Sequence, residues 1–458
     1  MKRFSYSVCA AFMAAALLLS CNKKIDSPSV TAIKGLTITA LHDTSSRTTF
    51  DGEKSKWSDG DKMNVLISAS DDSSIGPNEF EITDAENAKF SNSDVVTNAG
   101  ETYKFYAVYP VCDISADKCA TIHVGAAAQE QAAISSGHIA ALDPLYGYNE
   151  STPEAVSIPM KHTAVVMKLD IKNLTGNANL VVKKVKVKAP TGTAIAGSCN
   201  LNIASGAISP SSEGSNVIEL DVKDASAIAE DGIFTAWVAA APFTIARGGS
   251  LLFTVVDGDD NEYDVIKSFP DGRNFESGKI LSATLEIKEE AAATTIVSFN
   301  FTDENIYPEN VPTTTTNAVK NITCKSMNYI TDIYAAKGCY YSSTSSGRKL
   351  NIQEINTKNN ASQYATLSLP QIAGYKIVGI KLGNASATVS DGISAKVCCN
   401  KAGAEIEYVE KNFTSNAIFA TSDLESNILD DSPLYVKFVT TVNKKILINS
   451  LEITYARL

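Results

Sequence analysis

The stretch Ile218-Glu219-Leu220-Asp221-Val222 alternates apolar and charged residues at every step. Because successive side chains of a β-strand point to opposite faces, this pattern predicts a strand with one buried face and one face in water. The segments 184–188 and 434–438 alternate in the same way. Half-buried strands of this kind are typical of antiparallel sandwiches rather than of parallel α/β sheets. The sequence therefore predicts an all-β fold.

The residues between the strands support this fold class. Two strand-like runs, 251–256 and 262–266, are separated by Asp257-Gly258-Asp259-Asp260-Asn261, which predicts a β-hairpin with an exposed acidic turn. The alanine-rich segment 126–141 is the one stretch that resembles a helix, although Ser135-Ser136-Gly137 interrupts it. We therefore expect a mostly β chain with little helix.

The length of the chain, 458 residues, is too great for one ordinary hydrophobic core, so several domains are expected. Polar and small residues gather around 141–153 and again at 288–295, which suggests a boundary at each place. We therefore predict a first sandwich over residues 35–150, a second over 151–291 and a third over 292–458.

The N-terminus has the pattern of a bacterial lipoprotein signal. Lys2 and Arg3 precede a short apolar run, and Leu18-Leu19-Ser20-Cys21 ends it as a lipobox, whose cysteine becomes the lipidated N-terminus. The apolar run is too short to span a bilayer comfortably, so it is typical of a secretory signal. We predict a signal peptide over residues 1–20 and lipidation of Cys21. The alternative is a plain secretory signal followed by a chance cysteine.

The polar segment 21–34 is typical of a flexible tether between the lipid and the first strand. No later segment is apolar enough to cross a membrane, so the lipid on Cys21 is the predicted attachment. Several acyl chains, at about 0.8 kcal/mol per buried CH2, make such an attachment effectively permanent. We expect the protein at the outer membrane, on the cell surface.

The charge of the chain excludes one class of partner. Its formal net charge is −11 and it has no cluster of Lys and Arg, so it lacks the electrostatic footprint of a nucleic-acid-binding protein. The sequence also has no nucleophile elbow, zinc-protease motif, P-loop or dinucleotide fingerprint. The four histidines are scattered at spacings that make a zinc site improbable. We predict that the chain is not an enzyme and has no catalytic residues. A pair of carboxylates for glycoside hydrolysis stays open, because such residues come together only in the folded structure.

The nine cysteines do not form a redox motif. Cys9 leaves with the signal peptide, and Cys21 is the lipidation site. Cys112 and Cys119 bracket a short polar loop and could pair in an oxidising compartment. The number that remains in the mature chain is odd, so at least one thiol is free, and the pairing stays open.

Two short patterns have a direct physical interpretation. In Trp57-Ser58-Asp59-Gly60-Asp61, the indole is a large buried anchor beside a turn, Gly60 can take positive φ, and Asp61 can bind nearby backbone N–H groups. His162 precedes a buried strand, which favours a structural histidine over a ligand.

Several segments, in order, resemble Bacteroidetes fimbrillins, the family that contains type V pilus subunits. The resemblance covers residues 30–290 behind the lipobox. Its pieces are Arg47-Thr48-Thr49-Phe50, the segment 57–65, the aromatic strand 103–110, the histidine-containing strand 160–169 and the closing segments 275–280 and 284–287. The resemblance implies two β-sandwiches of transthyretin-like topology, exported to the outer surface.

The resemblance also implies a candidate processing site. In pilin members of the family, a surface protease cuts after an arginine near the N-terminus, which removes the first strand and opens a groove for a strand of the next subunit. Arg47 is the matching residue here. The partner would be another pilus subunit, joined by donor-strand exchange, in which an open sheet edge is completed by an incoming strand. The alternative is that Arg47 begins a strand and is never cut.

The last third resembles a jelly-roll or galactose-binding-like sandwich. Such domains often bind glycans on aromatic residues, and some hold a structural Ca2+. The candidate sugar ligands are Tyr329, Tyr334, Tyr340, Tyr341 and Arg348. The candidate calcium ligands are the pairs Asp303-Glu304 and Asp430-Asp431, with ordinary surface loops as the alternative. No other cofactor is expected.

These observations predict a fimbrillin-like surface lipoprotein that acts in adhesion. It would be an accessory, tip or anchor component of a pilus, or a monomeric adhesin, because the extra C-terminal domain does not fit a repeating stalk subunit. Its partners would be the outer membrane, other pilus subunits, and host or microbial glycans or proteins. The alternative is a surface glycan-binding lipoprotein that captures polysaccharide through its C-terminal domain. A hydrolase on the same scaffold is a third, weaker alternative.

Overall fold

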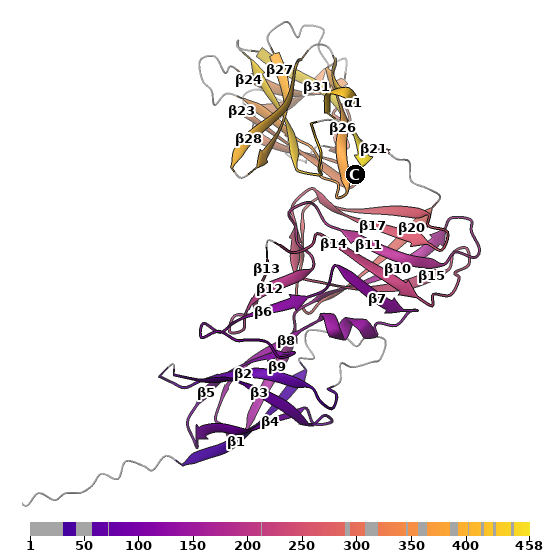
Figure 1. Cartoon of the computed structure of the whole chain (residues 1–458). Coiled ribbons are helices and arrows are strands. Elements are labelled where there is room, and N and C mark those ends of the chain that lie inside the picture. The colour runs from indigo at the N-terminus through magenta and orange to yellow at the C-terminus, as the bar shows by residue number, and fades with distance from the viewer. Residues whose placement is uncertain are drawn as a thin grey trace, which may run out of the picture.

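The computed structural model confirms the all-β fold (Figure 1). The residues that it describes are 31–42, 57–71, 73–211, 213–288, 294–306, 319–344, 347–355, 364–384, 393–401, 403–413, 416–424, 427–440 and 444–458. In this part of the chain no helix is long and apolar enough to cross a membrane.

Near the N-terminus, seven strands close into a barrel, drawn at the lower end of Figure 1. Their order around the ring is β1 (Ala32–His42), β4 (Lys89–Asn98), β3 (Ser74–Asp84), β2 (Lys62–Ser68), β5 (Tyr103–Tyr109), β8 (Leu145–Ser151) and β9 (Val156–His162). The core inside the ring includes Phe80, Phe90 and Phe105, none of which is exposed. Burial of large side chains of this kind stabilises a fold by about 1.5–3 kcal/mol each.

The second unit is a sandwich in the middle of the molecule (Figure 1). One sheet has the order β18 (Glu262–Phe269), β17 (Gly249–Asp257), β11 (Val182–Lys188), β14 (Val217–Lys223) and β7 (Ala128–Ala132). The other has the order β15 (Ile233–Ala240), β10 (Val165–Leu174) and β20 (Ile280–Lys288). Smaller sheets are β13 (Ala207–Pro210), β12 (Gly197–Asn202) and β6 (Cys119–Val124), and β16 (Phe243–Ile245) with β19 (Arg273–Phe275).

Strand pairing crosses the predicted boundary at residue 150 in both directions. β6 and β7 precede that boundary, yet they pair with β12 and β14 of the second unit. β9 follows it, yet it pairs with β1 and β8 in the barrel. A continuous core that includes Tyr106 of β5 and Trp237 of β15 joins the two units. The barrel and the second unit are therefore held together in two ways. The chain passes from the barrel into the second unit through β6 and β7 and then returns, and one hydrophobic core spans both units.

The expectation of a helix over residues 126–141 is wrong for most of that segment. Residues 128–132 form the strand β7, and a 3-10 helix covers Gly137–Leu142. The sequence does not indicate this strand, because its inward residues are glutamines, Gln129 and Gln131. Its alternation of buried and exposed residues is therefore not an alternation of apolar and polar ones.

The C-terminal unit is the third all-β unit, at the upper end of Figure 1. Its strands run in the order β28 (Ala404–Asn412), β27 (Ile393–Lys401), β30 (Leu434–Thr440), β25 (Ala365–Ser368), β23 (Tyr329–Thr344), β24 (Gly347–Ile355), β31 (Lys444–Arg457), β26 (Tyr375–Asn384) and β29 (Asn416–Phe419). β21 (Thr294–Asn300) pairs with β31, and β22 (Val319–Ser326) pairs with β23. The helical turns are η2 (Glu304–Ile306) and α1 (Thr421–Leu424).

One side chain of the second unit lies in the core of the C-terminal unit. Leu252 of β17 packs with the buried residues of the C-terminal unit, whereas its neighbour Leu251 packs into the sandwich. A Cβ atom at Gly374 would lie 2.4 Å from Leu252 Cδ2, and Gly374 has a φ of +77°. Only glycine therefore allows this close approach.

Polar contacts surround Leu252 at the same junction. The carboxylate of Asp431 accepts hydrogen bonds from the backbone N–H of Thr191 in the second unit, at 3.0 Å, and of Gly374 in the C-terminal unit, at 2.9 Å. Arg247 reaches both carboxylate oxygens of Asp332 at 2.6 Å. These polar contacts, together with the buried leucine, indicate a fixed junction rather than a loose linker.

The paired leucines of β17 offer a direct test of this junction. Leu252→Ala is expected to lower the free energy of unfolding by about 2–5 kcal/mol, because it leaves a cavity in the C-terminal core. Hydrogen–deuterium exchange should then rise first in β26 and β31. The matched control, Leu251→Ala, should instead loosen β11 and β17 of the sandwich. Faster exchange confined to the sandwich in the Leu252→Ala variant would show that the junction is not packed as described.

Candidate functional site

β1 is the strand that closes the barrel. It pairs with β4 in the antiparallel sense, with Ile38 opposite Phe90, and with β9 in the parallel sense, with Ile38 opposite Val156. Strand β1 therefore fills the space between two other strands of the ring. We call this place, with the backbone ladders on both sides of β1, the β1 seam.

The inward residues of β1 belong to the barrel core. Leu36, Ile38 and Ala40 are buried, whereas Leu41 points outward and is 51% exposed. This alternation explains why the strand stays in register, since a shift by one residue would expose Ile38 and bury its polar neighbours. Removing β1 would therefore uncover an apolar groove flanked by two unpaired strand edges.

Trp57 holds the C-terminal end of β1. Its indole N–H donates a hydrogen bond to the carbonyl of Ala40 at 2.9 Å. The ring lies edge-on to Phe90, with centroids 4.9 Å apart, and to Tyr109, with centroids 5.0 Å apart. The prediction of a buried aromatic anchor beside a turn is confirmed, and the structure adds that the anchor contacts β1.

The turn after Trp57 is organised by Asp61. One oxygen of its carboxylate accepts the backbone N–H of Ser58 at 2.7 Å, and the other accepts the hydroxyl of Tyr109 at 2.8 Å. Gly60 has a φ of +89°, which side-chain-bearing residues rarely adopt. Burial, together with the neighbouring Asp61 carboxylate, raises the pKa of Tyr109 to about 12.

His162 lies at the end of β9, where the barrel meets the second unit. Its Nδ1 atom is 2.6 Å from Oδ2 of Asp143, and both side chains are buried. The other oxygen of Asp143 accepts the backbone N–H groups of Thr163 at 3.1 Å and of Ala164 at 2.7 Å. This arrangement confirms the prediction of a structural histidine.

Two predicted sites, Cys21 and Arg47, lie outside the described residues. Their places in the sequence are nevertheless informative, because Cys21 precedes β1 and Arg47 follows it. A cut after Arg47 would therefore separate both Cys21 and β1 from the rest of the chain.

The predicted sugar ligands are on two strands. Tyr340 and Tyr341 belong to β23 and Arg348 to β24, but their side chains lie outside the described part of the structure. Tyr329 packs against the C-terminal core, where burial raises its pKa and its hydroxyl is hydrogen-bonded to Ser268. Tyr334 is on the opposite face of β23, because the two residues are an odd number of positions apart. The structure therefore does not bring Tyr329 and Tyr334 together.

Tyr334 has an aromatic neighbour that the sequence did not indicate. Its ring centroid is 5.4 Å from that of Tyr364, and the ammonium of Lys437 lies 5.0 Å from the centre of the Tyr364 ring. Lys437 and the hydroxyl of Tyr435 both contact Glu405, at 2.7 and 2.6 Å. These residues come from four strands or their ends, so only the fold could assemble them.

The predicted calcium ligands that can be described have other partners. Asp431 binds the backbone N–H groups at the junction, Asp430 pairs with Lys401 at 3.0 Å, and Asp303 accepts from Asn305. Among the described residues, no group of histidine, cysteine, aspartate or glutamate side chains has the arrangement of a metal site. Cys112 and Cys119 are free thiols, and burial raises the pKa of Cys112 to about 11.

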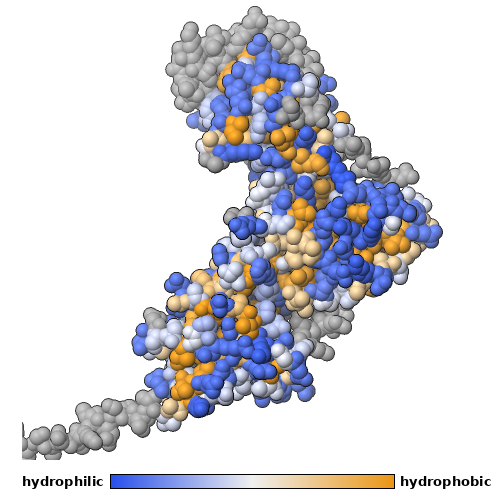
Figure 2. Space-filling model, in the orientation of Figure 1, coloured by the Kyte–Doolittle hydropathy of each residue, from blue (hydrophilic) through white to orange (hydrophobic). Residues whose placement is uncertain are grey.

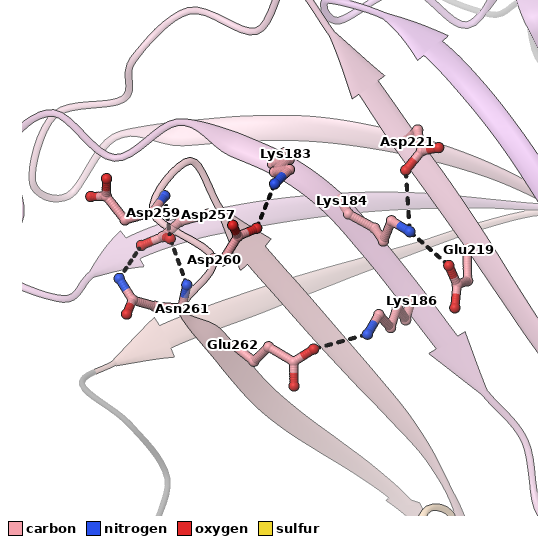
Figure 3. Close-up of polar contacts among 10 residues, drawn as sticks. All are labelled: Lys183, Lys184, Lys186, Glu219, Asp221, Asp257, Asp259, Asp260, Asn261 and Glu262. Atoms are coloured by element: carbon pink, nitrogen blue, oxygen red, sulfur yellow. Dashed lines mark hydrogen bonds and ion pairs between the residues drawn. The ribbon is translucent and has the colours of Figure 1, made fainter.

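The outer face of the five-stranded sheet carries rows of ion pairs (Figure 3). Lys184 pairs with Glu219 at 2.7 Å, and Lys186 pairs with Glu262 at 2.8 Å. Glu262 also binds Arg457 of the C-terminal unit at 2.7 Å. Figure 2 shows a mainly hydrophilic surface over this part of the molecule. Partly exposed pairs contribute roughly 0–1 kcal/mol each, so these ion pairs add little to the stability of the sheet.

The acidic turn next to this face is organised around Asp257. The carboxylate of Asp257 accepts the backbone N–H groups of Asp259 and Asn261, both at 2.9 Å, and the hydroxyl of Tyr263 at 2.9 Å. The predicted hairpin is thus confirmed, as β17 and β18, and its first acidic residue is buried rather than exposed.

Three solved structures of Bacteroides proteins resemble parts of this chain. A protein from Bacteroides uniformis that is assigned to cell adhesion has 15% identity over 56% of this chain and 93% of its own, with a TM-score of 0.37. A similar protein from Bacteroides ovatus has 16% identity, with coverage of 56% and 91% and a TM-score of 0.37. A fimbrial protein from Bacteroides vulgatus has 11% identity, with coverage of 57% and 96% and a TM-score of 0.33. No curated protein matches the chain.

A sequence profile described as fimbrillin-like matches residues 46–305, which is more than half of the chain. The match begins just after β1 and includes the remaining strands of the barrel, the second unit and the first strand of the C-terminal unit. This chain belongs to the fimbrillin-like family.

Proposed function

We propose that this protein is a cell-surface lipoprotein that acts in adhesion, as an accessory, tip or anchor component of a fimbria or as a monomeric adhesin. Membership of the fimbrillin-like family supports an adhesion-related, fimbrial role at the cell surface, and a structural rather than an enzymatic one. The observation that carries the finer proposal is the β1 seam, because its strand lies between Cys21, the predicted lipidation site, and Arg47, the cleavage candidate.

The seam suits a strand-exchange mechanism. A chain that stays attached at Cys21 keeps β1 in place and has a closed barrel. A chain cut after Arg47 can lose the lipid and β1 together, which leaves the edges of β4 and β9 unpaired. An incoming strand with apolar residues at alternate positions would restore both backbone ladders and refill the positions of Leu36, Ile38 and Ala40.

The C-terminal unit supports an accessory role rather than a repeating one. A repeating subunit needs a free strand that it can donate to its neighbour. Here β20 closes the second unit by pairing in parallel with β10, and only residues 289–293 separate it from β21. β21 is itself paired with β31 inside the C-terminal unit. The chain that follows the second unit is therefore part of the folded C-terminal unit, so neither β20 nor β21 is a free strand for donation.

The order of the units favours presentation of the C-terminal unit. β1 and the C-terminal unit are at opposite ends of the molecule (Figure 1). If the lipid is on Cys21, ten residues before the first described residue, the barrel is next to the membrane and the C-terminal unit points away from it. The fixed junction at Leu252 would hold that unit in one orientation.

One observation favours glycan capture as the second candidate. Tyr334 and Tyr364 present two neighbouring rings on the outer side of the C-terminal unit, beside Lys437 and Glu405. Aromatic rings flanked by hydrogen-bonding side chains are suited to a sugar, whose C–H groups pack on the rings and whose hydroxyls bind the polar atoms. This candidate therefore depends on Tyr334 rather than on Tyr329.

Two substitutions test the attachment and the processing in cells. With a palmitate analogue, wild-type protein and a Cys112→Ala control should be labelled, whereas Cys21→Ala should lose all label and be released from the cells. If the chain joins a fimbria after processing, SDS-resistant species of high mass should contain it in the wild type and be absent in Arg47→Ala. Label that persists in Cys21→Ala would contradict lipid anchoring. High-mass species that persist in Arg47→Ala would contradict processing at Arg47.

Glycan arrays separate the two candidate functions. If adhesion does not use the tyrosine pair, the intact protein and its Tyr334→Ala variant should give the same profile. Saturable binding of one polysaccharide that falls at least about tenfold in Tyr334→Ala, and is retained in a Tyr148→Ala control in the barrel, would favour capture, since a tenfold loss matches about 1.4 kcal/mol of contact energy.

A further inference from the structure

Within the part of the chain that the structure describes, β15 is a strand with a backbone ladder on one side only. It pairs with β10 on one side, and among the described residues no strand pairs with its other side. Its sequence, Ile-Phe-Thr-Ala-Trp-Val-Ala-Ala over residues 233–240, has no charge, glycine or proline. Uncharged strands of high β-propensity are the segments that recruit a second strand when their edge is free.

Two glutamine side chains fill this edge. Gln129 accepts the backbone N–H of Ala239 at 3.1 Å and donates to the carbonyl of the same residue at 2.6 Å. Gln131 accepts the backbone N–H of Trp237 at 2.7 Å and donates to the carbonyl of Thr235 at 3.0 Å. The outward backbone groups of a strand recur at every second residue, and the glutamines of β7 have the same spacing.

Contacts other than those with β15 also orient the two glutamine amides. The second N–H of Gln129 donates to the carbonyl of Ala126 at 3.0 Å, and that of Gln131 donates to the carbonyl of Ala133 at 2.7 Å. Both side chains are buried, with exposed fractions of 5% and 0%. The backbone of β7 is in turn paired with β14. The amides therefore present one donor and one acceptor to β15, as the peptide groups of a neighbouring strand would.

The chain around β7 approaches β15 so closely that other residues would not fit. A Cβ atom at Gly125 would lie 2.6 Å from the carbonyl oxygen of Ala239, and Gly125 has a φ of +62°. After β7 in the sequence, Nε2 of His138 is 3.0 Å from the carbonyl oxygen of Trp237. Because a carbonyl can only accept, this nitrogen carries the proton. Gly125, the two glutamines and His138 thus cover the edge at Thr235, Trp237 and Ala239.

We propose that Gln129 and Gln131 close the β15 edge against addition of a strand from a second copy of this chain. The glutamines replace a backbone ladder with side-chain amides, so the apolar strand is satisfied without a neighbour. This inference goes beyond the proposed function and holds whether or not Arg47 is cut. Its consequence is that strand addition between subunits is restricted to other edges, such as the β1 seam.

Gln129→Met/Gln131→Met tests the proposal, because methionine has a similar length and no hydrogen-bonding amide. The amides of Trp237 and Ala239 should exchange with deuterium at least about tenfold faster than in the wild type, since each loses its acceptor. The amides of Ala236 and Val238, which face β10, should exchange at the wild-type rate. Sedimentation velocity should show concentration-dependent dimers beyond any that the wild type forms.

The matched control is Glu130→Met on the same strand, which adds an apolar side chain on the exposed face of β7. It should leave both the exchange of Trp237 and Ala239 and the state of association unchanged. If the double variant does not fold, Gln131→Met alone is measured at Trp237. Wild-type exchange at Trp237 in a folded variant, or a folded double variant that associates no more than the wild type, would overturn the proposal.

Discussion

The barrel depends on the pairing of β1 with two strands that would otherwise be edges. A sheet that closes on itself has no free edge only if every strand is paired on both sides, and β1 meets that condition through an antiparallel ladder to β4 and a parallel ladder to β9. Its buried residues add about 1.5–3 kcal/mol for each large side chain, a considerable share of the roughly 5–15 kcal/mol that stabilises a typical domain. A cut in the chain after β1 would therefore not by itself eject the strand. It would make β1 replaceable by another strand of similar pattern.

The rest of the molecule is built so that this replaceable strand is at one end of a continuous body. β6 and β7 pair with strands of the second unit and so join it to the barrel. A shared core that includes Tyr106 and Trp237 fills the space between the two units. Between the second unit and the C-terminal unit, Leu252 likewise fills space by packing into the C-terminal core. Force applied to the C-terminal unit would thus pass through packed cores rather than through flexible linkers. The closed edge of β15 adds a second constraint, because it leaves fewer places where another strand can attach.

Alternation was sufficient to predict strands where one face is apolar, as in 218–222, which is β14, and in 251–266, which is the hairpin of β17 and β18. It failed at β7, where glutamines point inward and satisfy backbone groups instead of filling a core. The partners of β6 and β7 could not be predicted either, because pairing between strands about 80 residues apart depends on the whole packing arrangement rather than on local pattern. The turn at Trp57 and Asp61 was predicted from its residues, but its contact with β1 was not.

The most direct test of this account is whether the β1 seam accepts a strand in trans. Purified mature protein is cut with an arginine-specific protease, the fragment that contains β1 is removed in mild denaturant, and a labelled peptide of residues 31–42 is added, with protease-treated Arg47→Ala protein as the control. The account predicts saturable binding to the cut protein alone, with recovery of its thermal stability, because the peptide restores both ladders. Cut protein that remains folded and binds no peptide, or equal binding by the Arg47→Ala control, would contradict it.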